Sequence, residues 1–271
     1  MRKKQIEEVK AHYDADPALE WQRLEENREE FLLTTCMMDR YIKPGDSVLD
    51  IGGGPGRYAV YYARKGCKVT LADLSEGNVA FAGTKAEEEG LPLTALAANC
   101  LELDSLHLGQ FDHVFLMGPL YHLLEAADRV MAVEVALRHL KPGGKLYVAF
   151  LPTVSGLIYC LQHEAILPEA RKNPDDMRHL AAIAAGEDFK GRGFTQVYCF
   201  ALENILPFME QFPLKKLHFF SQEGCLAPNK MELRKRSEAE QELWLETARR
   251  YLERPEFLSW AEHVMYIGEK E

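Results

Sequence analysis

The amino-acid sequence predicts an α/β protein with a doubly wound, mostly parallel seven-stranded sheet and helical inserts. Short apolar segments alternate with helical segments from about residue 47 to residue 150, as they do when helices connect parallel strands. A glycine-rich turn, DIGGGPG at 50–56, lies where the first apolar segment meets the first helical one. These two observations indicate a sheet with functional loops at the carboxyl ends of its strands.

The elements of the first half follow in a regular order. Residues 5–42 have few helix breakers after Pro17 and repeat apolar residues at helical spacing, so we expect them to be helical. KPGD at 43–46 is a turn, and Gly66 and Gly90 end two of the later helices. The strands are expected in SVLDI (47–51), CKVTLADL (67–74), LTALAAN (93–99), FDHVFLM (111–117) and KLYVAFL (145–151), with helices at 58–66, 76–90 and about 120–140.

The alternation stops after residue 152. Residues 153–212 contain helical pieces and a glycine-flanked stretch, GRGF at 191–194, which is either a lid hinge or a simple loop. LKKLHFFSQEG at 214–224 is expected to be the sixth strand, residues 237–262 are helical, and HVMYIGEK at 263–270 is the last strand. We therefore expect an N-terminal helical cap (1–42), a ligand-binding core (43–152), a helical lid insert (153–212) and a segment with a helical insert that completes the sheet (213–271).

Composition narrows the possible partners. The chain has 271 residues and a net charge of -10, so it does not attract nucleic-acid phosphates as a whole, and we expect no nucleic-acid partner. Its six cysteines are scattered without a CxxC pair, which is typical of free thiols in a reducing cytoplasm. The N-terminus lacks the apolar segment of a signal peptide, and no apolar run is long enough for a membrane span. We expect a cytoplasmic monomer or homodimer with no membrane partner.

The glycine turn and an acidic residue after it indicate a nucleoside-type cofactor. Glycines at a strand-to-helix turn let the backbone approach a ligand closely, although a purely structural turn uses them too. The spacing Gly52-x-Gly54-x-Gly56 differs from the dinucleotide pattern G-x-G-x-x-G. Asp73 ends the second strand, where a carboxylate can accept hydrogen bonds from both ribose hydroxyls. Ser75, and not Asp73, is expected to cap the next helix.

At this point the sequence resembles the class I, Rossmann-like S-adenosylmethionine-dependent methyltransferases, in their bacterial small-molecule form. The resemblance covers residues 45–152 and the last strand, and its motifs occur in the family's order and spacing. The motifs are VLDIGGGPG (48–56), TLADLS (70–75), AANCLEL (97–103), FDHVFLMG (111–118) and LKPGGKLYV (140–148).

The resemblance implies S-adenosylmethionine as the cofactor, S-adenosylhomocysteine as the product, and a binding residue at each matching position. Asp50 would reach the ammonium of the methionine moiety, and the loop glycines would give that moiety room. Asn99 stands where the family often has an Asp that binds the adenine amino group. The implied cofactor-binding residues are Asp50, Gly52, Gly54, Gly56, Asp73, the adenine-packing Leu74, Asn99, Cys100 through its backbone N–H, and Met117 through its carbonyl.

The stretch LMGPLYHLL at 116–124 bears on the acceptor. Methyltransferases of exocyclic base amines carry Asn/Asp-Pro-Pro-Tyr/Phe here, whereas this chain has Gly118 and Leu120 at the first and third positions. The side chain that accepts the amine hydrogens is therefore missing, which favours a small-molecule acceptor. His122 is our candidate for the general base or for orienting an acceptor hydroxyl, although it could also be a packing residue. Tyr121 is a candidate substrate contact.

Residues outside the core supply the remaining candidates. Tyr13 is expected near the transferable methyl, as a second catalytic candidate, and Arg23 is expected to pair with the carboxylate of the cofactor. Helix packing explains Tyr13 equally well and Arg23 somewhat better. His163 and Tyr198, in the lid insert, are candidate substrate contacts. Cys160 and His163 have the spacing of two metal ligands on a helix, but no further ligand is evident, so we expect no metal.

The predicted function is S-adenosylmethionine-dependent methyl transfer to an oxygen, nitrogen or sulfur atom of a small molecule. An in-line displacement of this kind depends mainly on alignment of the reacting groups, so its catalytic residues leave a weak sequence signal. Two alternatives remain open at this point: a nicotinamide-dependent oxidoreductase, and a protein that binds S-adenosylmethionine without catalysis. The glycine spacing and the KPGG turn speak against the first alternative.

Overall fold

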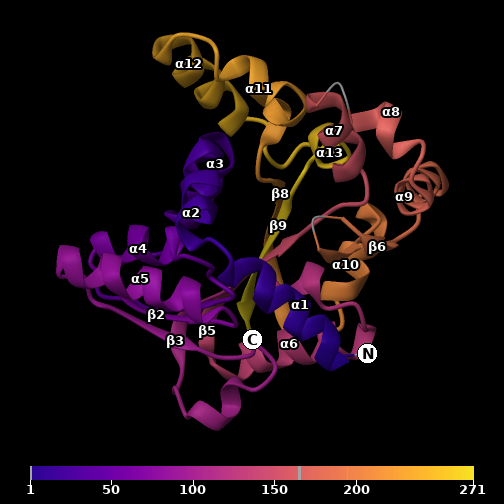
Figure 1. Cartoon of the computed structure of the whole chain (residues 1–271). Coiled ribbons are helices and arrows are strands. Elements are labelled where there is room, and N and C mark those ends of the chain that lie inside the picture. The colour runs from indigo at the N-terminus through magenta and orange to yellow at the C-terminus, as the bar shows by residue number, and fades with distance from the viewer. Residues whose placement is uncertain (1, 164–165, 194) are drawn as a thin grey trace.

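The sheet and its strand order are those of a doubly wound fold. The computed structural model describes residues 2–163, 166–193 and 195–271, and within these ranges seven strands form one sheet in the order β3-β2-β1-β4-β5-β9-β8 (Figure 1). The strands from β3 to β5 run parallel, and β9 is antiparallel to both β5 and β8. The predicted fold class is therefore confirmed. The strands are β1 (Ser47–Ile51), β2 (Lys68–Asp73), β3 (Leu93–Ala97), β4 (Phe111–Leu116), β5 (Leu140–Phe150), β8 (Leu214–Ser221) and β9 (Val264–Lys270).

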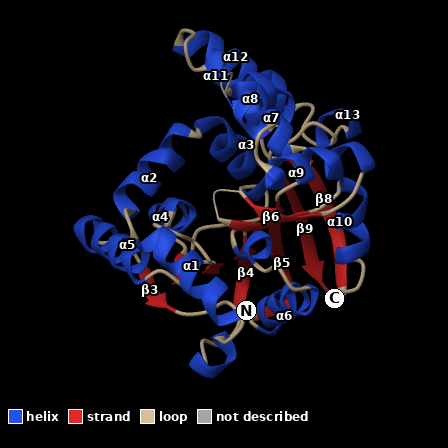
Figure 2. Ribbon diagram, turned by 45° about the vertical axis from the view of Figure 1, so that its right-hand side comes forward, coloured by secondary structure: helices blue, strands red, loops and turns tan. Residues whose placement is uncertain are grey.

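Helices cover both faces of this sheet, and further helices lie above its carboxyl edge (Figure 2). Three helices precede the sheet, α1 (Arg2–Asp14), α2 (Pro17–Glu26) and α3 (Arg28–Met38). The connecting helices are α4 (Arg57–Arg64), α5 (Glu76–Glu89) and α6 (Ala126–Arg138), with short 3₁₀ turns η1 (Leu103–Leu106) and η2 (Pro119–His122). The lid insert holds α7 (Ser155–Gln162), α8 (Ile166–Ala170), α9 (Pro174–Ala185), the hairpin β6 (Phe189–Arg192) and β7 (Gln196–Cys199), and α10 (Leu202–Met209). Before the last strand come η3 (Gly224–Asn229), α11 (Lys230–Leu233), α12 (Glu238–Arg249) and α13 (Pro255–Leu258).

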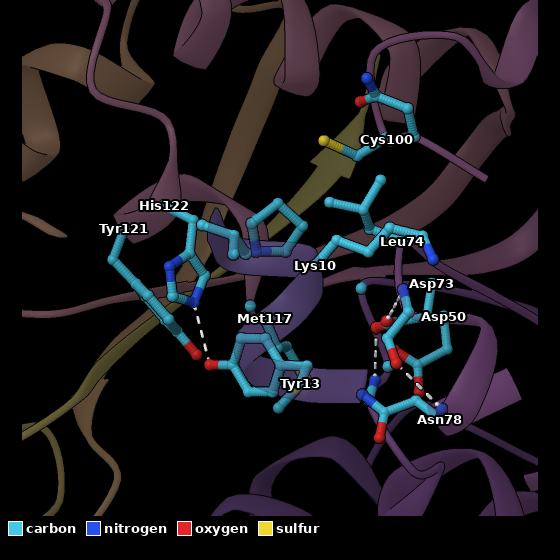
Figure 3. A pocket seen from close by; sticks show the side chains of 18 of the residues that line it. Lys10, Tyr13, Asp50, Asp73, Leu74, Asn78, Cys100, Met117, Tyr121 and His122 are labelled. Atoms are coloured by element: carbon cyan, nitrogen blue, oxygen red, sulfur yellow. Dashed lines mark hydrogen bonds between the residues drawn. The ribbon is translucent and has the colours of Figure 1, made fainter. Parts of the chain in front are cut away.

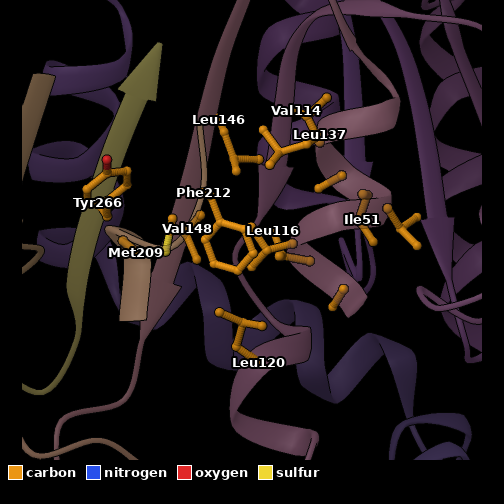
Figure 4. Packing of buried hydrophobic residues seen from close by; sticks show 14 of the residues in the cluster. Ile51, Val114, Leu116, Leu120, Leu137, Leu146, Val148, Met209, Phe212 and Tyr266 are labelled. Carbon is orange, nitrogen blue, oxygen red and sulfur yellow. The ribbon is translucent and has the colours of Figure 1, made fainter. Parts of the chain in front are cut away.

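The apolar pattern of the strands explains why the sheet is covered on both sides. Successive residues of a strand point to opposite faces. In β4, Val114 and Leu116 pack into one apolar cluster with α6 and α10 (Figure 4), whereas Phe115 packs into a second cluster with α3, α4 and α12. All three are fully buried. A strand that is apolar on both faces can form only at the centre of a three-layer structure.

The order of the strands also locates the functional edge. β1 pairs with β2 on one side and with β4 on the other, so the direction in which the chain winds reverses between β1 and β4. Ligands of open α/β sheets bind in the crevice at the carboxyl ends of the strands at such a point. The glycine loop follows β1 and the segment around His122 follows β4, so both lie at this edge.

Several element boundaries differ from the predicted ones. The N-terminal helical segment is broken at Asn27, which ends α2 and precedes α3. The helix predicted from about residue 120 begins only at Ala126, because Pro119 starts a separate 3₁₀ turn. KPGG lies inside β5, where Gly143 has φ +73° and the pairing with β4 is irregular. Of the GRGF stretch, Gly191 and Arg192 lie in β6 and Gly193 follows it, while Phe194 lies outside the described residues.

None of the helices in the described ranges has the length and apolar character needed to cross a membrane. The division of the chain into four segments stays a prediction.

Candidate functional site

A cavity of about 200 Å³ opens at the carboxyl ends of β1, β2 and β4, beneath the N-terminal helix α1 (Figure 3). The glycine loop, the end of β2 and the segment after β4 form its walls. Most of the predicted site residues meet here, although they come from distant parts of the chain. The predicted residues that line the cavity are Tyr13, Arg23, Asp50, Gly52, Gly54, Asp73, Leu74, Asn99, Cys100, Met117, Tyr121 and His122.

The floor of the cavity requires glycine because two loops approach each other closely. A Cβ on Gly52 would lie 2.7 Å from Cγ of Pro119, and the residue has φ +70°. A Cβ on Gly118 would lie 2.8 Å from the carbonyl oxygen of Gly52. Gly118 thus lets the loop after β4 lie against the loop after β1, and any side chain there would separate the two.

Gly56 has a different role from the one expected. It does not line the cavity, and a Cβ there would lie 3.1 Å from Cβ of Ala82 on α5. The residue also has φ +90° at the N-terminal end of α4. Gly56 therefore serves the turn and the packing of α4 on α5, and the room for a ligand comes from Gly52 and Gly54.

Two carboxylates lie on one side of the cavity. The Asp73 carboxylate accepts hydrogen bonds from the backbone N–H groups of Gly54 (2.8 Å) and Ser75 (2.9 Å). Burial raises the pKa of Asp73, and these hydrogen bonds and the Asn78 amide counteract the rise. Each carboxylate oxygen has a second lone pair, so Asp73 keeps acceptor capacity for a ligand. Ser75 caps α5 as predicted, because its side chain accepts from the Asn78 N–H.

Asp50 is the second carboxylate, and it is 3% exposed. Burial, and then the negative charge of Asp73, raise the pKa of Asp50 to about 7. No group in the described part of the chain donates a hydrogen bond to it. A buried carboxylate without a donor or cation is a costly arrangement, and a cationic ligand would relieve it.

Three predicted adenine contacts, Leu74, Asn99 and Cys100, lie along another wall. The Asn99 side chain accepts a hydrogen bond from the Leu101 N–H at 3.1 Å, which shapes the turn after β3. Its amide nitrogen is the group that can donate to a ligand. Asn78, which is 1% exposed, lines the cavity as well, and the sequence reasoning missed it.

Tyr13 and His122 form a direct pair on the side of the cavity opposite Asp50. The Tyr13 hydroxyl lies 3.0 Å from Nε2 of His122, and the two rings meet edge to face (Figure 3). Burial, followed by the charge of His12, lowers the pKa of His122 to about 4, so the imidazole is neutral at pH 7. Burial raises the pKa of Tyr13 well above its usual value. Two candidates far apart in sequence thus share one hydrogen bond.

Asp14 holds the helix that carries Tyr13 in place. Its carboxylate accepts from the Ser75 hydroxyl at 2.6 Å and from the Gly77 N–H at 3.0 Å, at the N-terminus of α5. These hydrogen bonds, the Ser75 one foremost, lower the pKa of Asp14 to about 2. The Gln5 amide, also on α1, donates to the carbonyl oxygen of His122. The helix is therefore tied to both sides of the cavity.

Arg23 lines the cavity but already has a partner. Its guanidinium makes two parallel hydrogen bonds to Glu20, at 2.7 and 2.6 Å. To bind a ligand carboxylate, as expected, Arg23 would have to share or leave Glu20. Arg57, which follows the glycine loop, is a second cation on the cavity wall, and burial lowers its pKa.

Two predicted substrate contacts lie elsewhere. His163 is not among the cavity-lining residues, and its Nδ1 pairs with the carbonyl oxygen of Tyr159 one helical turn earlier. Tyr198 also lies outside the lining; its hydroxyl donates to Asp188, and the Arg129 guanidinium lies 3.4 Å from the centre of its ring. We drop both from the site because their polar groups serve the lid insert. Among the described residues, no group of three or more His, Cys, Asp and Glu side chains could hold a metal ion.

Most of the residues that sequence reasoning missed hold other site residues in position. Asp14, Gln5 and Thr195 act through contacts with residues far away in the chain, and none belongs to a motif. The only signal near Thr195 was the adjacent GRGF stretch.

Comparison with known proteins relates the core of the chain to methyltransferases. Residues 48–144 match the family described as "Methyltransferase domain". The ubiquinone biosynthesis O-methyltransferase of Caulobacter vibrioides is 37% identical over 107 residues, covering 40% of this chain and 41% of that protein. Its counterpart in Xanthomonas oryzae pv. oryzae is 33% identical over 149 residues, covering 52% and 60%. The chain thus spans only part of the length of the curated relatives it matches.

Solved structures extend the likeness over nearly the whole chain at the level of the fold. Magnesium protoporphyrin IX methyltransferase from Synechocystis PCC 6803, crystallised with SAH, is 14% identical with a TM-score of 0.60, covering 98% of this chain and 100% of that one. The 1,6-didemethyltoxoflavin-N1-methyltransferase of Burkholderia thailandensis, crystallised with its acceptor and S-adenosylhomocysteine, is 14% identical with a TM-score of 0.57, covering 98% and 86%. Residues 48–144 therefore match the methyltransferase domain family, and the chain shares the Rossmann-like fold of these solved structures.

Proposed function

We propose that this protein transfers a methyl group from S-adenosylmethionine to a small-molecule acceptor. The observation that carries the proposal is the Tyr13–His122 hydrogen bond, which lies in the same cavity as the glycine loop, Asp50 and Asp73. One side of the cavity offers carboxylates to a cationic nucleoside, and the other side offers a neutral base. The named relatives and structural neighbours support this choice, since those proteins are methyltransferases.

The residues present fit the cofactor at both of its ends. No described residue donates a hydrogen bond to the buried Asp50 carboxylate, and an ammonium group would supply one. Asp73 can accept from ribose hydroxyls, and Leu74, Asn99 and Cys100 offer an apolar contact and polar groups to a purine ring. The glycines leave the backbone between these groups uncovered. When bound, the cofactor supplies a methyl group on a positively charged sulfur, which is already activated for transfer.

The side chains of Tyr13 and His122 would remove the proton that the acceptor loses during methyl transfer. When the proton of the neutral His122 ring is on Nδ1, Nε2 accepts the hydrogen bond of the Tyr13 hydroxyl. As an acceptor oxygen or nitrogen gains the methyl group, it loses its proton to the Tyr13 oxygen, while Tyr13 passes its own proton to His122. Burial keeps both groups neutral until that moment. Tyr121 and Met117 line the same wall and would orient the acceptor.

The acceptor class follows from what surrounds the pair. Gly118 offers no side-chain acceptor for an amine, and its close approach to Gly52 excludes any larger residue. Because Tyr13 and His122 would take up a proton, the acceptor group that suits them best is one that loses a proton on methylation, such as a hydroxyl. A small-molecule substrate, the absence of a nucleic-acid partner, the oligomeric state and a cytoplasmic location remain predictions from the sequence.

Transfer of radiolabelled methyl from S-adenosylmethionine into a metabolite extract tests the proposal. We expect labelled product with the wild-type protein, and a loss of about 100-fold in turnover for His122→Ala and Tyr13→Phe, with unchanged affinity for S-adenosylhomocysteine. Normal turnover in both variants would remove the pair from the mechanism. Tight binding of the cofactor with no labelled product from any acceptor fraction would favour a binding protein without catalysis.

A further inference from the structure

The His122 ring has a second partner that comes from the lid insert. Thr195 lies at the tip of the β6–β7 hairpin, beside Gln196, the first residue of β7, and is 2% exposed. Its hydroxyl oxygen lies 3.2 Å from Nδ1 of His122, on the side of the ring opposite Tyr13. The ring is therefore held at both nitrogens, by α1 at one and by the hairpin at the other.

The hydrogen bonds around Thr195 favour one of the two tautomers of the His122 ring. The Thr195 hydroxyl donates its one hydrogen to the Gln196 carbonyl oxygen at 3.2 Å. In this arrangement the Thr195 oxygen accepts from Nδ1 of His122, which places the ring proton on Nδ1. The Gln196 carbonyl, which can never donate, also hydrogen-bonds to His122. In a neutral imidazole, a proton on Nδ1 leaves a lone pair on Nε2, where the Tyr13 hydroxyl lies.

We propose that Thr195 is a positioning residue that fixes His122 in the tautomer with Nδ1 protonated, so that Nε2 stays unprotonated and can take a proton from Tyr13. This inference rests on the proposed function of the pair. In the other tautomer, Nε2–H would point at the Tyr13 oxygen, and Tyr13 would have no base to receive its proton. The lid insert, through Thr195, thereby keeps His122 in the tautomer that can act as a base.

A packing role alone would give Thr195 different properties. Valine has nearly the same shape as threonine but lacks the hydroxyl, so Thr195→Val keeps the packing and removes only the polar contact. Thr195→Ser keeps the hydroxyl and removes a methyl group. If packing alone mattered, the serine variant would be the more damaging of the two. The proposal predicts the opposite order.

The tautomer can be read directly by ¹⁵N NMR of protein labelled at histidine, because protonated and unprotonated ring nitrogens have distinct shifts. The His122 signals are identified by their loss in His122→Asn. At pH 7 we expect Nδ1 of His122 to be protonated in the wild type and in Thr195→Ser, and a shift toward protonated Nε2 in Thr195→Val. A wild-type ring protonated at Nε2, or an unchanged ring in Thr195→Val, would overturn the proposal. The measurement needs no substrate, so its result does not depend on whether the protein transfers methyl groups.

Turnover provides the second readout. We expect Thr195→Val to lower kcat about 10- to 100-fold with little change in KM or in affinity for S-adenosylhomocysteine, and Thr195→Ser to retain most of kcat. Equal losses in both variants, with matching losses of thermal stability, would show that Thr195 only packs. If the NMR result holds and no variant or wild-type protein turns over, the proposed function fails while the tautomer assignment survives.

Discussion

At the scale of single residues, Asp50 is the group whose charge should respond most to the cofactor. Its pKa of about 7 means that the carboxyl is about half protonated at pH 7 in the free protein. An ammonium group beside it would lower that pKa, so binding should release up to about half a proton at pH 7. Calorimetry in buffers of different ionisation enthalpy measures this release. Asp50→Asn should bind more weakly and release none, and equal release in both proteins would contradict the assignment.

The low pKa of His122 sets the pH dependence of turnover. With a pKa of about 4 in the folded protein against 6.5 ordinarily, the base stays neutral through pH 6. We expect kcat to be level from pH 8 to about 5 and to fall as the pH drops through about 4. A midpoint near 6.5 would mean that His122 is not the base, or that solvent reaches it.

The same residue should also affect stability. The unfolded chain binds a proton on His122 at a higher pH than the folded chain does, so unfolding becomes easier as the pH falls from about 6.5 toward about 4. Urea unfolding at pH 6.5 and 4.5 should show a smaller pH-dependent loss of stability in His122→Asn than in the wild type. An identical loss in both proteins would place the titration elsewhere.

Asp73 is the residue on which nucleoside binding should depend most. Loss of paired hydrogen bonds to a carboxylate should weaken S-adenosylhomocysteine binding by about 2–4 kcal/mol, roughly 30- to 700-fold in Kd. Asp104→Ala, a half-exposed carboxylate outside the cavity lining, is the matched control and should bind normally. An unchanged dissociation constant in a folded Asp73→Ala protein would remove Asp73 from the site.

At the scale of elements, hydrogen bonds of Asp14 hold α1 against the start of α5. Asp14→Ala removes both hydrogen bonds that tie α1 to the start of α5, contacts worth about 1–3 kcal/mol each when a charge takes part. We expect faster hydrogen exchange in α1, weaker cofactor binding and lower kcat together. Asp16→Ala, which removes only the N-cap of α2, should leave exchange in α1 nearly unchanged. Equal effects of the two substitutions would argue against Asp14 as the tie.

The elements differ in how well the sequence predicts them, and the reason is the range of their interactions. β4 is apolar at every buried position except His113, and β1 runs directly into the glycine-rich turn, so the local sequence pattern was enough to predict both strands. The β6–β7 hairpin has only four residues in each strand, and long-range contacts with His122 and α6 determine its position. No local pattern in 153–212 carries that information.

At the scale of the whole molecule, the site is built where segments distant in sequence meet. The proposed cofactor side of the cavity lies within residues 48–144, whose motifs led to the prediction of Asp50, Asp73 and the loop glycines. The acceptor side joins α1, the loop after β4 and the lid insert. Tyr13 and His122 could be named as candidates because aromatic and imidazole groups suit the chemistry, but their mutual contact depends on tertiary packing. The departures, Gly56, His163 and Tyr198, are residues whose neighbours the sequence does not show.

Calorimetric titration of the whole protein with S-adenosylhomocysteine and, separately, with NAD tests the central claim most directly. The proposed binding of an ammonium by Asp50 and of a ribose by Asp73 predicts one-site binding of S-adenosylhomocysteine in the micromolar range or tighter and no measurable heat with NAD. Binding of NAD without binding of S-adenosylhomocysteine would contradict the account and return the chain to the nicotinamide-dependent class.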